Sequence, residues 1–348
     1  MSVQRFFRSA RFQALWLSLL LTALIVASSG MGYMHIHFFD VLKIVLAKLS
    51  GVQSLTDGVN RLFPVVITEV RLPRILTSAT VGAGLALSGV VFQGILLNPL
   101  ADPYTLGVSA GAALGASLAL WLNISAWGMW SVPLLAFAGA ALTLLAVIYL
   151  ASSGSGLSSG DLILSGIIVS AILSAGVSFI KYMADEQVGV IIFWLMGSFA
   201  SKTWADVWLT LAVLILGTGV SMYFSRELNV MALGSRTAAS LGVDIRKVRL
   251  ILLITASLVA AVCVSVSGII GFVGLLVPHI MRTICGPDNP RLIPVSVLAG
   301  ACLLLAADTL TRAVLPHEIP IGVLTALIGG PFFCYIYRKR QMSGAHDD

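Results

Sequence analysis

The sequence predicts an all-α protein that crosses a membrane about ten times. First, 58% of the 348 residues are hydrophobic and 10% are charged, whereas a soluble domain carries about 25% charged residues. Second, residues 12–39, 75–101, 103–160 and 251–281 contain no Asp, Glu, Lys or Arg, and a helix needs about 20 apolar residues to span a bilayer. Third, the alternation of apolar and polar residues that is typical of a transmembrane β-barrel is absent.

The expected spans follow from the positions of charges, prolines and glycines. The first apolar segment follows Arg5, Arg8 and Arg11, is longer than the apolar region of a signal peptide and lacks a convincing cleavage site, so we expect a retained span. The prolines of 98–103 end the second span, and residues 188–200 are too few to cross the membrane. We expect spans at about residues 14–34, 75–97, 104–123, 128–151, 161–183, 205–224, 248–267, 268–282, 292–313 and 319–337.

Residues 35–49 follow the first span with apolar residues at helical spacing and charged residues opposite them, which predicts a helix at the membrane interface. His35 and His37 have no third ligand nearby and read as interfacial residues. The four cysteines form no CxxC pair. The sequence therefore predicts neither a metal site nor a disulfide framework.

Two further patterns concern helix packing. Gly107, Gly111 and Gly115 form a doubled GxxxG motif, which predicts close approach of two helix backbones. The eighth span is interrupted by glycines between residues 268 and 274, as in broken membrane helices that are surrounded by protein. In the ninth span, Asp308 and Arg312 are four residues apart, which suggests an ion pair along one helix face with either a functional or a structural role.

Residues 226–249 form the long polar passage between apolar segments, with five basic and two acidic residues. Basic loops of membrane proteins stay on the cytoplasmic side. Ser235 can N-cap a short helix that Gly242 can end. The passage is then either a docking element for a soluble partner or a loop that only sets topology. Ten spans place both termini in the cytoplasm with 13 of the 21 Lys and Arg residues on the inner side, so orientation explains the net charge of +6 without nucleic acid.

Several phrases of the sequence resemble the FecCD-type permeases, the membrane subunits of type II ABC importers for iron–siderophore complexes, haem and vitamin B12. The resemblance covers about residues 62–338 and implies the type II ABC importer permease fold, with residues 1–348 as one transmembrane domain and 226–249 as its coupling loop. The phrases are RLPR at 71–74, NPLADPYTLGVSAGA at 98–112, WLMGSF at 194–199, the 226–249 loop with its ALG and TAASLG, GFVGLLVPHIMR at 271–282 and IPIGVLTALIGGPFF at 319–333.

The resemblance implies roles for particular residues. Exposed forks of three arginines receive carboxylates of a periplasmic binding protein, and short helices in the polar loop dock on the ATPase. The fifth and tenth spans line a pathway between two permease subunits, with gate positions near two loops. The implied residues are Arg71, Arg74 and Arg312 for the binding protein; Leu233, Gly234, Ser235, Ala238, Ala239, Leu241, Gly242 and Arg246 for the ATPase; and Leu100, Ser159 and Gly160 for the gate.

The partners follow from the same resemblance. No Walker motif is present, so the chain is not expected to be an enzyme, and ATP and Mg would bind a separate ATPase. Expected partners are a second permease subunit, identical or related, two cytoplasmic ABC ATPases, a periplasmic binding protein and the lipid of the bacterial inner membrane. Ferric siderophore is the first substrate hypothesis, with haem and cobalamin open. The rival from another class is an ion-coupled secondary transporter, for which Asp308 is almost the sole titratable candidate.

Overall fold

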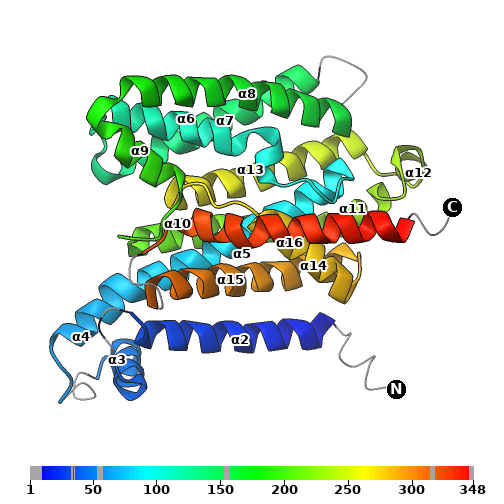
Figure 1. Cartoon of the computed structure of the whole chain (residues 1–348). Coiled ribbons are helices and arrows are strands. Elements are labelled where there is room, and N and C mark those ends of the chain that lie inside the picture. Colours follow the sequence, from blue (N-terminus) through cyan, green and yellow to red (C-terminus); the bar gives the residue numbers. More distant parts are fainter. Residues whose placement is uncertain are drawn as a thin grey trace, which may run out of the picture.

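The computed structural model describes residues 10–32, 34, 36–52, 58–152, 157–313 and 318–344. Within these ranges every regular element is a helix and no strand is present. The long helices lie side by side (Figure 1), with α3 and α4 at one end of the bundle and α12 at the other. Arg5, Arg8 and His35, which the sequence analysis named, lie outside the described residues.

Each of the ten expected spans overlaps one α-helix of the described residues. Seven of them, within the described residues, are long and apolar enough to cross a membrane, and three apolar helices (108–121, 273–285 and 321–335) are shorter. The helices are α2 Ala10–Gly30, α3 Phe38–Ser50, α4 Leu62–Val65, α5 Leu72–Leu96, α6 Val108–Trp121, α7 Ser131–Ala151, α8 Ser159–Met183, α9 Val188–Leu195, α10 Trp204–Tyr223, α11 Ser225–Met231, α12 Ser235–Ser240, α13 Ile245–Ser267, α14 Val273–Cys285, α15 Asn289–Ala313 and α16 Ile321–Gly344.

The helix α5 forms the centre of the bundle. The most apolar part of the helical stretch that contains it is 89% buried, because α10, α13, α14 and α15 all pack against α5. The expected start at residue 75 is wrong: helical backbone begins at Leu62 and continues through a π-helical segment, Val66–Arg71, into α5. A π-helical segment has more residues per turn than an α-helix, so the side chains that follow it are rotated about the helix axis. Such segments are frequent at functional sites.

The predicted close packing of the GxxxG motif is confirmed between α6 and α7. A Cβ atom on Gly111 would overlap the carbonyl oxygen of Gly139, and a Cβ atom on Gly115 would overlap that of Leu135. The two backbones therefore touch directly. This contact holds the α6–α7 pair together without large side chains.

The predicted interruption of the eighth span is a full break in the helix. The expected start at residue 268 is wrong, because α13 ends at Ser267 and α14 begins at Val273. Between them the backbone is irregular, with positive φ at Gly268 and Phe272. The hydroxyl of Tyr104 donates to the Ile270 carbonyl at 2.5 Å, and the buried polar backbone of this segment is thus satisfied by protein rather than by lipid.

An apolar cluster fills the end of the bundle where α12 lies. It joins Ile95 at the end of α5, Leu157 before α8, Leu228 of α11, Ala238 of α12 and Val248 of α13, all of them buried. We call these residues the α12-end cluster. They place the polar loop of the sequence and the ends of α5 and α8 in one shared core.

Candidate functional site

Three arginines from distant parts of the sequence meet at the end of the bundle opposite α12. Arg71 ends the π-helical segment and is 5% exposed. Its guanidinium donates to the carbonyl oxygen of Ser29 at 2.7 Å and to that of Met34. Arg71 therefore fixes the chain that leaves α2.

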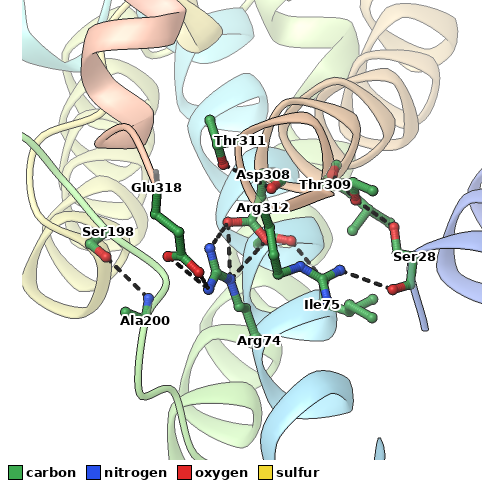
Figure 2. Close-up of polar contacts among 12 residues, drawn as sticks. Ser28, Arg74, Ile75, Ser198, Ala200, Asp308, Thr309, Thr311, Arg312 and Glu318 are labelled. Carbon is green, nitrogen blue, oxygen red and sulfur yellow. Dashed lines mark hydrogen bonds and ion pairs between the residues drawn. The ribbon is translucent and has the colours of Figure 1, made fainter. Parts of the chain in front are cut away.

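Arg74 lies one turn further along and joins two carboxylates. Figure 2 shows its guanidinium between Asp308 of α15 and Glu318, which lies three residues before α16. The Nε and Nη2 groups donate to Asp308 at 2.9–3.2 Å, and Nη1 donates to both oxygens of Glu318 at 3.1 Å. The Asp308 side chain is 2% exposed and that of Glu318 is 45% exposed. The pair with Asp308 is thus buried, while the pair with Glu318 faces outward.

Arg312 does not pair with Asp308, so the ion pair expected along one face of α15 is wrong. Its guanidinium donates to the carbonyl oxygens of Ser28 at 2.9 Å and Met31 at 2.8 Å. Two residues four apart on one helix can pair only if no group from a neighbouring helix pairs with one of them first. Here Arg74 of α5 pairs with the Asp308 carboxylate. Arg312 instead ties the end of α2 to α15.

Arg71 and Arg74 are not exposed forks in this structure, and the docking role of the three arginines stays a prediction. Arg71 is 5% exposed and the Arg74 side chain 12%, because internal carbonyls and carboxylates already accept their N–H groups. Glu318 is the exposed member of the cluster. A carboxylate of an incoming protein would therefore have to compete with Glu318 for Arg74. Sequence reasoning missed Glu318, although an acidic residue just before the last span was a visible signal.

The polar loop forms two short helices, α11 and α12. The expected N-cap is wrong by one residue: Gly234, with φ +101°, occupies the N-cap position, and Ser235 is the first helical residue. The expected end at Gly242 is confirmed. Gly242 has φ +85° and donates to the Ala239 carbonyl, and Val243 donates to that of Ala238. These two bonds form a Schellman motif, which ends α12 sharply.

The surface around α12 carries apolar and basic side chains. Leu233 and Leu241, which flank the helix, are 65% and 62% exposed. Ala239 and Arg246 are exposed as well. Ala238 is fully buried in the α12-end cluster, so it anchors the helix and faces away from any partner. Exposed leucines on a rigid loop are typical of a protein-binding surface, and the docking role of these residues stays a prediction.

Two of the predicted gate residues, Ser159 and Gly160, lie at this end of the bundle. The Ser159 hydroxyl donates to the Ile95 carbonyl at 3.3 Å, so the start of α8 touches the last turn of α5. Ser159 and Gly160 belong to the first turn of α8 and not to the preceding loop, because Ser158 N-caps the helix by accepting from the Asp161 amide. Leu100 is 41% exposed. Their role in gating stays a prediction.

An apolar hollow of about 590 Å³ lies beside the break between α13 and α14. It is lined by residues of α9, of the irregular segment and of α16. The Gly322 amide donates to the Met196 carbonyl at 3.0 Å, which holds the start of α16 against the end of α9. The lining includes Leu195, Met196, Ile269, Val323, Ala326 and Leu327.

Within the described residues, seven long apolar helices and three shorter ones are the composition of an integral membrane protein. The FecCD transport family matches residues 19–339, so the chain belongs to that family. It is a permease of the type II ABC importer class.

Relatives of known name support the assignment. The cobalamin import system permease protein BtuC of Halobacterium salinarum is 41% identical, over 92% of this chain and 88% of the relative. The molybdate import system permease protein MolB of Haemophilus influenzae is 38% identical, over 95% and 96%. A solved inward-facing structure of an ABC transporter, assigned to the metal-chelate type, has a TM-score of 0.81 and 36% identity, covering 94% of this chain and 98% of that chain.

Proposed function

We propose that this chain translocates a metal chelate from a periplasmic binding protein to the cytoplasm, driven by ATP hydrolysis in a separate ATPase subunit. A ferric siderophore is the first candidate substrate. The observation that carries the proposal is the exposed, sharply capped helix α12 with its flanking leucines in a chain of the FecCD family. A soluble partner can push on such a helix without unfolding it.

The orientation of the chain follows from the same loop. In Figure 1, α2 begins and α16 ends on the side where α12 lies. The basic residues of 226–249 support a cytoplasmic location for this side, because basic loops of membrane proteins stay on the cytoplasmic side. Two ATPases would then meet the α12 loops of two permease subunits, through Leu233, Leu241 and Arg246.

The binding protein would dock at the opposite end, where Arg71, Arg74 and Arg312 meet. Acidic side chains of the binding protein suit an arginine fork, because a carboxylate accepts two parallel N–H bonds. Since Glu318 already occupies Arg74, docking exchanges one carboxylate for another. The other two arginines would steer the approach by their charge more than by direct contact.

The pathway would run between two copies of the chain along α8 and α16. The apolar hollow beside α16 favours a bulky chelate with an apolar exterior over a small hydrated oxyanion, which needs polar donors. Ferric siderophores, haem and cobalamin are all bulky chelates with apolar parts. The similarity to a permease named for cobalamin import makes cobalamin the second candidate.

The rival reading as an ion-coupled transporter finds little support. Such a transporter needs a titratable group near the bilayer midplane. Asp308 lies in the second-last turn of α15 and is held by Arg74, so it has neither the depth nor the freedom to bind and release a proton.

Reconstituted transport tests the proposal. The chain, its ATPase and its binding protein are placed in proteoliposomes, and uptake of a radiolabelled ferric siderophore is measured with ATP, with haem and cobalamin as competitors. ATP-dependent uptake that neither competitor reduces supports the siderophore hypothesis. Transport of cobalamin or haem instead would overturn the substrate hypothesis. Uptake driven by a proton gradient without ATP would overturn the importer reading itself.

A further inference from the structure

Arg249 lies in the second turn of α13, buried and without an ion-pair partner. It is 8% exposed. In the described part of the chain no ion pair joins it to an acidic side chain, and its Nε atom has no hydrogen-bond partner. A protein that buries a guanidinium without a carboxylate partner is less stable than one with an apolar side chain of the same size at that position. Positions that break the rules of packing in this way are often functional.

The guanidinium has one direct partner, the carbonyl oxygen of Leu157, which accepts from Nη1. Leu157 is buried in the α12-end cluster and directly precedes the N-cap of α8. Two residues later, the Ser159 hydroxyl contacts the last turn of α5. Arg249 thus reaches residues 157–160, which include two of the three predicted gate residues, Ser159 and Gly160. We call residues 157–160 the gate segment.

The same end of α13 is joined to α12. Residues 241–244 connect the two helices, and the Schellman bonds of Gly242 and Val243 fix the first half of the connection. Asp244 then caps α13 by accepting from the Lys247 amide at 3.0 Å. Because these hydrogen bonds hold both halves of the connection, α12 and the first turns of α13 are expected to move together.

We propose that Arg249 is a positioning residue that ties the gate segment to α13, so that a displacement of α12 by the ATPase reaches the gate. The apolar contacts of the α12-end cluster can slide, since they have no direction. The hydrogen bond from Arg249 to Leu157 is directional and resists sliding. This inference rests on the proposed function, because it assigns a route to the coupling between ATPase and pathway.

The experiment compares uptake with ATP hydrolysis in the same proteoliposomes, which hold the permease, its ATPase and its binding protein. The probe is radiolabelled ferric hydroxamate or cyanocobalamin, whichever the wild-type complex transports. The variants are Arg249→Met, which removes the donor, and Arg249→Lys, which keeps a charged donor. The control is Arg291→Met, which removes an exposed arginine in the first turn of α15.

Arg249→Met is expected to assemble and hydrolyse ATP, with uptake per ATP reduced about tenfold, the factor that corresponds to one lost charge-assisted hydrogen bond. Arg249→Lys should recover most of the ratio, and Arg291→Met should equal the wild type. A purely structural role would lower uptake and hydrolysis together and leave their ratio unchanged. An unchanged ratio in Arg249→Met would therefore overturn the inference.

If Arg249→Met fails to assemble, Arg249→Lys and Arg249→Gln replace it. The ratio is then expected to fall in the order wild type, Lys, Gln, because the donor becomes shorter and loses its charge. Wild-type ratios in both variants would overturn the inference. If the wild-type complex itself shows no ATP-driven uptake, the proposed function fails first, and the two failures are thus distinguishable.

Discussion

The ion pair between Arg74 and Asp308 provides the sharpest test of the structure. Asp308→Asn removes the charge that Arg74 contacts through Nε and Nη2. Both side chains are buried, with 12% and 2% exposed. Removing one partner of a buried pair costs about 3–5 kcal/mol, because the other charge remains without compensation. Asparagine keeps one acceptor and Glu318 keeps part of the neutralisation, so we expect the lower end, about 3 kcal/mol.

Glu318→Gln acts on the same guanidinium from its exposed side. The Glu318 side chain is 45% exposed, and exposed ion pairs contribute about 0–1 kcal/mol. The two substitutions thus remove similar contacts to one arginine, and the structure predicts costs that differ severalfold. Burial, rather than the number of hydrogen bonds, decides the difference.

The assay is unfolding of the purified chain in mixed detergent micelles with increasing SDS, followed by circular dichroism. Glu186→Gln, an exposed acidic residue in the turn after α8, serves as the control for loss of one negative charge. Asp308→Asn should lower the free energy of unfolding by about 3 kcal/mol, and Glu318→Gln should resemble the control. Equal costs for Asp308→Asn and Glu318→Gln would refute the assignment of a buried and an exposed partner.

Three further predictions follow from the site. Glu318→Gln should tighten binding of the periplasmic protein about two- to fivefold, since an exposed competitor is removed. A dissociation constant equal to that of the wild type in titration calorimetry would contradict the exchange of carboxylates. Gly242→Val should cost about 1–2 kcal/mol because of the positive φ, and it should weaken ATPase co-purification more than Gly242→Asn, while equal effects would argue against the sharp end of α12. Gly111→Leu should abolish a monodisperse peak in size-exclusion chromatography, whereas Gly219→Leu, which meets nothing within 4 Å, should not; a normal Gly111→Leu peak would disprove the direct α6–α7 contact.

Much of the architecture could be predicted from the sequence. Apolar stretches longer than about 20 residues require spanning helices whatever the rest of the chain does. Local chemistry also placed the helix end at Gly242 and the close contact at Gly111, because positive φ and missing side chains act within a few residues. The predicted starts of two helices were less exact. The helix that starts at Leu62 and the start of α14 at Val273 depend on which neighbouring groups form hydrogen bonds with the backbone.

The candidate site was only partly predictable for the same reason. The three arginines could be placed at one end of the bundle from their positions in the chain, but their partners could not. Asp308 had a nearby arginine four residues away on its own helix, yet the packing of α5 against α15 brought Arg74 closer.

The sequence by itself determined the membrane class, the number of apolar segments and the basic loop, because transfer of side chains to lipid depends on local composition. Only the tertiary structure decided which charges are buried and what they contact. Arg71 turned inward to backbone carbonyls, Arg249 reached Leu157, and Glu318 emerged as the exposed acid of the cluster. Such contacts join residues that are far apart in the chain, and the energy of each depends on a burial that no single segment sets.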